Sequence, residues 1–154
     1  MSEYKATIEW ARATADFDYQ TYNRSHTLSF EGGIRVPASA AAGNTPPTAA
    51  GAPGVDPEQA FVASLSSCHL LWFLHLASQA KLVVERYVDE ASGVLEKNAE
   101  GRMAMTRVSL RPVVTYAGRQ PTAQEHAQLH ERAHDKCFIA NSVKTEVTVD
   151  PRLA

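Results

Sequence analysis

The amino-acid sequence predicts a single α+β domain over residues 1–154. Three observations carry this prediction: paired strand-like segments lie on both sides of one long apolar segment, that segment has a strong helix start, and a second helix start follows later in the chain. The strands are arranged as hairpins and do not alternate regularly with helices, which excludes a doubly wound parallel sheet. A chain of this length can bury a core without disulfide or metal.

The first segment, 4–13, alternates apolar residues (Tyr4, Ala6, Ile8, Trp10) with more polar neighbours and predicts a half-buried strand. Residues 26–36 place Leu28, Phe30, Ile34 and Val36 around Glu31-Gly32-Gly33, which predicts a hairpin. The chain therefore begins as a meander.

Residues Pro37 to Val55 are rich in Ala, Pro, Gly and Thr and contain no charge. They predict a long loop, because such a composition cannot pack a core of its own. Structureless loops of about 20 residues inside a domain are either functional lids or disordered connections, and both interpretations remain open here.

Asp56-Pro57-Glu58-Gln59 predicts a helix start, because Asp56 can accept from free amides, Pro suits the first turn and Gln59 can complete a capping box. The helix should extend to about Lys81. Its apolar residues lie nearly all round, so most of its faces must be enclosed. One domain's sheet is too small for this, which favours a second chain.

Two further strands are predicted at 83–95 and 102–116, joined by the turn-like residues 97–101 into a second hairpin. Thr122-Ala123-Gln124-Glu125 is a capping box that opens a helix reaching Lys136 or Cys137. A last strand is predicted at 143–149.

Composition and charge exclude some functions. The formal net charge of −2 includes no basic excess that would point to nucleic acid. The longest apolar run, 60–77, is interrupted by serines and histidines and therefore predicts a core helix and not a membrane span. No signal-peptide pattern opens the sequence, so we expect a cytoplasmic protein.

The chain has only two cysteines, Cys68 and Cys137. In a reducing compartment a structural disulfide is the less expected use of such a pair, and two inert buried thiols are the alternative. A thiol that reduces peroxides must ionise, which requires a nearby cation, and it needs a second thiol to protect its sulfenic acid from further oxidation. Cys137 is the one candidate for that second thiol.

Cys68 lies in the middle of the predicted apolar helix, where a buried cation would be needed to stabilise its thiolate. Arg24 and Arg35 flank the first hairpin and are the candidates, and Glu58 could pair with either. Ten residues separate Glu58 from Cys68, about 15 Å along a straight helix. If both serve one site, either the helix breaks or the two residues come from different chains of a homodimer.

At these residues the sequence resembles the OsmC/Ohr family, the osmotically induced protein C and organic hydroperoxide resistance proteins. DPEQAF (56–61) followed by Ser67-Cys68 is similar to the family's "NPE(Q/E)…AC" helix, and HDKCFIAN (134–141) is similar to its resolving-cysteine segment. The resemblance covers essentially the whole chain.

The resemblance implies an interlocked homodimer in which antiparallel sheets wrap two long central helices. It also implies a cofactor-free, metal-free thiol peroxidase that reduces organic hydroperoxides with a dithiol such as dihydrolipoamide. By its motifs, Cys68 is the attacking thiol, Cys137 the resolving thiol and Glu58 the carboxylate that holds an arginine. Arg24 precedes a strand as in the hydroperoxide-resistance branch and is preferred to Arg35. Three departures from the family pattern, Asp56, His69 and the long 37–55 loop, leave substrate preference open.

Five of the six histidines offer rival sites. His126, His130 and His134 are spaced at i, i+4 and i+8 and could bind a transition metal, but we favour an ordinary polar helix face because no further ligand completes a motif. His134 is expected at the surface, and His69 and His75 are expected to be hydrogen-bonded core residues.

The alternative function is that of a non-catalytic dimer, which binds small ligands or takes part in a stress response. The presence of both cysteines argues against it. A Cys-His hydrolase is disfavoured because no glycine motif for an oxyanion accompanies Cys68.

Overall fold

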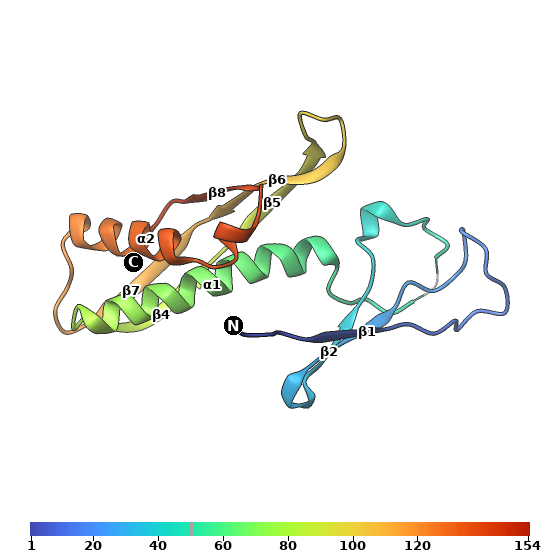
Figure 1. Cartoon of the computed structure of the whole chain (residues 1–154), viewed down its shortest axis with the longest axis horizontal. Coiled ribbons are helices and arrows are strands. Elements are labelled where there is room, and N and C mark those ends of the chain that lie inside the picture. The colour runs from blue at the N-terminus through green and yellow to red at the C-terminus, as the bar shows by residue number, and fades with distance from the viewer. Residues whose placement is uncertain (50) are drawn as a thin grey trace. The chain divides into compact units, whose positions relative to one another are not determined.

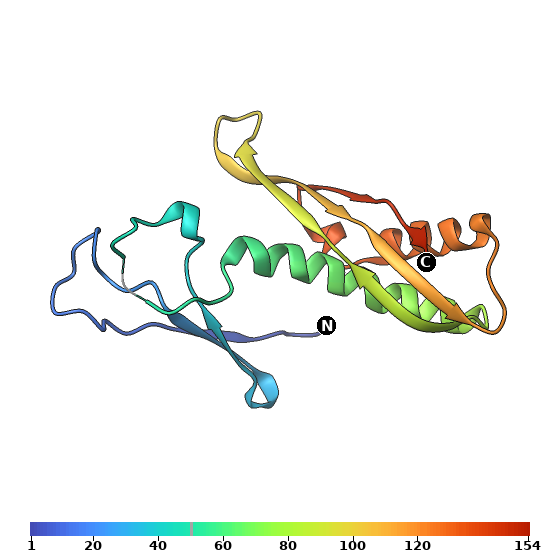
Figure 2. The ribbon, with the colours of Figure 1, turned by 180° about the vertical axis from the view of Figure 1, so that it is seen from behind.

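The computed structural model describes residues 1–49 and 51–154. These residues form two compact units, 1–60 and 61–154, which are described separately. Figures 1 and 2 show the path of the chain from opposite sides. The fold is α+β with two α-helices among the described residues, as the sequence predicted. The strands form three small sheets, and the expectation of purely antiparallel sheets was wrong, because two of the three contain a parallel pair.

The first unit contains an antiparallel sheet of three strands in the order β1-β2-β3, with bounds β1 Ala6–Glu9, β2 His26–Phe30 and β3 Arg35–Ala38. The predicted hairpin is confirmed: Gly32 and Gly33 have φ of 76° and 78° in its turn, a conformation that favours glycine. β1 is shorter than the predicted strand 4–13. Beyond Glu9 the chain turns to other partners, since the Trp10 indole donates to the Asn23 carbonyl at 2.8 Å.

The predicted loop 37–55 is closed at its base. Ser39 N–H donates to the Val55 carbonyl at 3.1 Å, and Val55 N–H donates to the Pro37 carbonyl at 3.0 Å. Gly54 is required at this point, because a Cβ on it would lie 2.6 Å from the Ala38 backbone. A short 3₁₀ helix, η2 (Ala42–Asn44), interrupts the loop, and Ala50 lies outside the described residues.

Helix α1 runs from Pro57 to Gln79 and confirms the predicted helix, although it ends two residues earlier. Its capping box is present: Gln59 N–H donates to Asp56 Oδ1 at 2.7 Å, and Asp56 N–H donates back to Gln59 Oε1 at 3.5 Å. By length and composition α1 could cross a membrane. One face nevertheless packs into the core of this chain, with Leu65, His69, Phe73, Leu76 and Ala77 buried.

The second unit holds two sheets, of order β4-β7-β9 and β5-β6-β8. The strand bounds are β4 Val83–Asp89, β5 Ser92–Lys97, β6 Met103–Leu110, β7 Pro112–Ala117, β8 Glu146–Val149 and β9 Arg152–Leu153. The predicted hairpin of 83–95 with 102–116 is confirmed, because β4 pairs with β7 and β5 with β6 in antiparallel register. The prediction that each arm is a single strand was wrong. Each divides in two, because Pro112 has no N–H and the Arg111 amide donates to Asp89 Oδ1 at 2.6 Å instead of to a neighbouring strand.

Helix α2 (Ala123–Lys136) confirms the predicted second helix and its Thr122–Glu125 capping box. The last predicted strand is shorter, as β8, and β9 was not predicted. β8 and β9 pair in parallel with β6 and β7.

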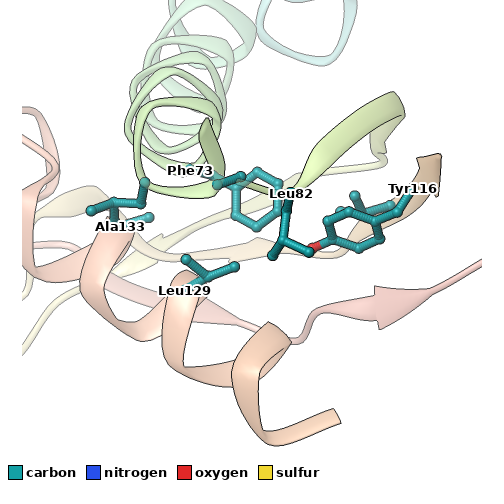
Figure 3. Close-up of a cluster of buried hydrophobic side chains, with 8 residues drawn as sticks. Phe73, Leu82, Tyr116, Leu129 and Ala133 are labelled. Atoms are coloured by element: carbon teal, nitrogen blue, oxygen red, sulfur yellow. The ribbon is translucent and has the colours of Figure 1, made fainter. Parts of the chain in front are cut away.

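The helices and sheets of this unit enclose its main core. Figure 3 shows Phe73 of α1 turned toward Leu82 and Tyr116, with Leu129 and Ala133 of α2 on the other side. A second cluster forms around Leu65, Val108 and Leu110. The two clusters fix α1 and α2 against the sheets, and therefore fix the side chains that these helices carry toward each other.

Candidate functional site

Cys68 and Cys137, far apart in the sequence, lie next to each other in the second unit. Both are free thiols. Cys68 is in the middle of α1, and Cys137 is the C-cap of α2. The two thiols are close enough for the Cys68 thiol to raise the pKa of Cys137 by hydrogen bonding and by charge. A disulfide between them would link α1 to the end of α2.

The two thiols have different surroundings. Cys137 is 1% exposed, whereas Cys68 is half-buried. The pKa of the Cys137 thiol is raised to about 11, mainly by burial and also by the Cys68 thiol, while the backbone amides of Ala140 and Ile139 act in the opposite direction. The Ala140 N–H donates to Cys137 Sγ at 3.4 Å. The Cys137 sulfur is therefore buried, with backbone amide donors beside it.

Cys68 opens onto a largely apolar pocket of about 320 Å³. Its other lining residues are Leu71, Trp72, His75 and Phe138. The Trp72 ring makes edge-to-face contacts with two other lining residues, Phe138 at 5.4 Å and His75 at 5.6 Å between ring centroids. The pocket can hold a small apolar group beside the Cys68 sulfur.

Next to the cysteines, α1 and α2 are joined by a pair of histidines. His69 Nε2 and His130 Nδ1 share a hydrogen bond of 2.9 Å, and the two rings stack. Both side chains are buried, as is His126, whose Nδ1 is 2.8 Å from the Tyr116 hydroxyl. The prediction of an ordinary polar face for His126 and His130 was wrong, because this face of α2 packs on α1.

The remaining histidine predictions had mixed outcomes. His69 is a hydrogen-bonded core residue as predicted, whereas His75 is exposed and lines the Cys68 pocket. His134 is half-buried, not at the surface, and its Nδ1 is buried. Over residues 1–49 and 51–154, no group of three or more His, Cys, Asp or Glu side chains is arranged to hold a metal ion.

Burial keeps these histidines neutral. Desolvation lowers the pKa of His69 to about 4, helped by His134 and opposed by Asp89, and it lowers the pKa of His130 to about 2. The pKa of His126 is lowered by the same cause. Within the described chain, one ring nitrogen of each of these three buried histidines has no hydrogen-bond partner. None of the three histidines lines the Cys68 pocket. They therefore form a buried structural contact.

Arg24 and Glu58 line one pocket of the first unit. Its volume is about 320 Å³, and His26 and Asn44 line it as well. The Arg24 guanidinium stacks on the Tyr22 ring at 3.6 Å and donates to the carbonyls of Tyr22 and Tyr19, each at 2.7 Å. Among the described residues no ion pair joins Arg24 to Glu58.

Arg35, the other predicted arginine, is in a different environment. It forms an exposed ion pair with Glu9, at 3.6 Å across the sheet of the first unit. Helix α1 is continuous from Pro57 to Gln79. Glu58 and Cys68 could serve one site either through a break in the helix or by coming from different chains. The continuous helix excludes the break.

Sequence reasoning missed the Cys68 pocket and the His69–His130 pair. Helix spacing held a signal for both. Leu71, Trp72 and His75 follow Cys68 by three, four and seven residues, which places all of them on one helix face. His126 and His130 precede Cys137 by eleven and seven residues, so a buried Cys137 implies that they are buried too.

Comparisons with known proteins agree with this fold. The family model described as OsmC-like protein matches residues 49–152. An OsmC-like protein of unknown function from Vibrio cholerae is 46% identical, with a TM-score of 0.92 over 98% of this chain and 99% of that one. No curated protein matches the chain.

Two more distant solved structures share the fold. An organic hydroperoxide resistance protein from Elizabethkingia anophelis is 17% identical, with a TM-score of 0.67 over 99% of this chain and 97% of that one. The organic hydroperoxide resistance protein OhrB of Bacillus subtilis is 19% identical, with a TM-score of 0.61 over 99% and 98%. On the match of the family model and the similarity to the Vibrio protein, this chain belongs to the OsmC-like family.

Proposed function

We propose that this protein is a thiol-dependent peroxidase that reduces organic hydroperoxides through Cys68, with Cys137 as the resolving thiol. The observation that carries the proposal is the adjacency of two cysteines of unlike exposure, one on an apolar pocket and one sealed behind it. The family includes proteins named for organic hydroperoxide resistance, which supports the same chemistry.

The proposed reaction has two protein steps. The Cys68 thiolate attacks the terminal oxygen of the hydroperoxide, the O–O bond breaks, and the alkoxide leaves as an alcohol after taking a proton. The resulting Cys68 sulfenic acid is attacked by the Cys137 sulfur, which forms a disulfide and releases water. A dithiol then restores both thiols.

The pocket favours organic substrates over hydrogen peroxide. Leu71, Trp72 and Phe138 offer apolar area that an alkyl or aryl group can cover and that hydrogen peroxide cannot. Each buried methylene contributes about 0.8 kcal/mol, so a cumyl group has several kcal/mol of binding energy available.

Arg24 is proposed as the cation that stabilises the Cys68 thiolate, with Glu58 holding it. Both line one pocket, and Arg35 is engaged with Glu9. Because α1 is continuous, we propose that Arg24 and Glu58 of one chain complete the Cys68 site of a second chain. Leu74 of α1, which is 37% exposed and does not line the Cys68 pocket, supports the same homodimer.

In this proposal residues 1–154 act as one cytoplasmic OsmC-like domain. Its substrates are a small hydroperoxide and a dithiol reductant such as dihydrolipoamide, and it needs no cofactor, nucleic acid or membrane.

The test is consumption of cumene hydroperoxide and of hydrogen peroxide, with dihydrolipoamide as reductant. The wild type is expected to consume cumene hydroperoxide much faster. Cys68→Ser should abolish this activity, and Cys137→Ser should retain one turnover per chain but not repeated turnover. If the wild type consumes neither peroxide with any dithiol, the protein is instead a ligand-binding dimer of the same fold.

Arg24→Ala and its control Arg35→Ala test which arginine stabilises the Cys68 thiolate. Loss of a charge-assisted contact to the thiolate should lower kcat/KM for cumene hydroperoxide about 10- to 100-fold in Arg24→Ala. Arg35→Ala should stay within about twofold, because its exposed ion pair contributes little. Equal losses in both variants would remove Arg24 from the proposed site.

A further inference from the structure

We propose that, when the Cys68–Cys137 disulfide is reduced, the external thiolate attacks Cys68 and not Cys137, so that the reductant becomes attached to Cys68. This inference rests on the proposed two-cysteine mechanism, because it concerns the disulfide that this mechanism produces.

Access to the two sulfur atoms is unequal. Thiol–disulfide exchange needs a thiolate to approach one sulfur in line with the bond that breaks. The Cys68 sulfur opens onto the apolar pocket, whereas Cys137 does not line that pocket and is 1% exposed. An incoming thiol can therefore reach Cys68 from the pocket, with Cys137 behind it as the leaving sulfur.

Two backbone amides beside Cys137 partly offset the cost of a buried leaving sulfur. The electron pair of the broken bond moves to Cys137 Sγ, which already accepts the Ala140 N–H at 3.4 Å and is favoured as an anion by the Ile139 amide. These amides belong to the chain that follows α2, so they are in place before the reaction.

Burial acts against Cys137 as a leaving group, because it raises the pKa of that thiol to about 11. Leaving-group stability therefore opposes the release of Cys137. We infer that access decides the outcome, since an attacking thiolate has no path to a sealed sulfur. The released Cys137 then takes a proton and is kept as a thiol, which slows its return attack on the mixed disulfide.

A dithiol reductant completes the catalytic cycle. The first thiolate of the reductant bonds to Cys68 as the bond to Cys137 breaks. The second thiol of the reductant then attacks the reductant's own sulfur, Cys68 leaves as a thiolate, and the reductant becomes an intramolecular disulfide. The dithiol loses two electrons, and the protein disulfide gains them.

The direct test locates the mixed disulfide. The wild type is oxidised with diamide, so that no peroxide is needed, and mixed with 2-mercaptoethanol, which has no second thiol. After an acid quench, N-ethylmaleimide labels the free cysteine and peptide mass spectrometry assigns both. We expect mercaptoethanol on Cys68 and maleimide on Cys137, in at least about tenfold excess over the reverse.

Mercaptoethanol on Cys137, or on both cysteines equally, would overturn the inference. Failure of diamide to form the disulfide would overturn it too. Loss of peroxidase activity alone would not, because the disulfide in this experiment forms without peroxide, so the two failures are distinguishable.

Two single-cysteine variants measure access independently. With hydroxyethyl disulfide as probe, Cys137→Ser leaves only Cys68 and should form a mixed disulfide at least about tenfold faster than Cys68→Ser, which leaves only Cys137. Equal rates, or a faster Cys68→Ser variant, would contradict the unequal access.

Discussion

Two neighbouring contacts join α1 to the α2 segment, and they differ in access. The cysteine contact (Cys68 and Cys137) opens onto an apolar pocket, whereas the histidine contact (His69 and His130), one residue along α1, is sealed in the core. The histidines are strongly shifted in pKa, a property that marks many catalytic groups. Here that shift reports burial, and the observation that supports the proposed chemistry is the apolar pocket beside Cys68.

The largest expected difference between the two contacts is in turnover. Cys68→Ser should reduce cumene hydroperoxide consumption to the uncatalysed rate, because it removes the nucleophile. His69→Leu should keep kcat/KM within about threefold, since the imidazole bonds to His130 and not to the pocket. A loss in His69→Leu as large as that in Cys68→Ser, in a variant with an unchanged circular dichroism spectrum, would make the histidine part of the chemistry.

The next difference is the response to acid. The folded-state pKa values of His69, about 4, and His130, about 2, lie below the ordinary value of 6.5, so the unfolded chain binds more protons below pH 6.5. The histidine contribution to stability is complete above pH 6.5 and is lost as pH falls. We expect the free energy of unfolding to fall between pH 6.5 and pH 5, with a slope that approaches about 1.4 kcal/mol per histidine for each pH unit.

Urea unfolding at pH 7, 6 and 5 measures this slope. His69→Leu/His130→Leu, which has neither titrating group, is the control and should show a flatter dependence. If the free energy of unfolding of the wild type is the same at pH 7 and pH 5, the two histidines are not buried from solvent.

A smaller effect is expected from breaking the histidine contact at neutral pH. His130→Leu leaves a buried His69 nitrogen without its partner, which costs about 1–3 kcal/mol in the free energy of unfolding. The double variant His69→Leu/His130→Leu should lose less than the sum of the single variants, because both polar groups are removed. His75→Leu, at an exposed position on the same helix, should stay within about 0.5 kcal/mol. Additive losses in the double variant would argue against a direct bond.

The smallest effect is expected at the rim of the Cys68 pocket. Phe138 is 66% exposed and meets the Trp72 ring edge-on, a contact worth about 0.5–1.5 kcal/mol. Phe138→Ala should therefore raise the KM for cumene hydroperoxide about 2- to 10-fold and leave the rate with hydrogen peroxide unchanged. A parallel change for both peroxides would show that the ring acts on Cys68 and not on the substrate.

The sequence by itself determined the features that depend on neighbouring residues. Capping boxes are local hydrogen-bond patterns, and both were predicted at the correct residues, 56–59 and 122–125. The Gly32-Gly33 turn followed from its residues in the same way. Membership of the OsmC-like family was also evident, because the segments around the two cysteines are local motifs.

Tertiary structure decided the rest. Whether a strand continues past Asp89 or divides depends on which carboxylate reaches the Arg111 amide, a contact across 22 residues that no local pattern encodes. The burial of His126 and His130 depends on which face of α2 meets α1, and polarity alone predicted the opposite. The exposure of Cys68 and the sealing of Cys137 likewise depend on packing, because burial is a property of the surroundings of a residue and not of the residue itself.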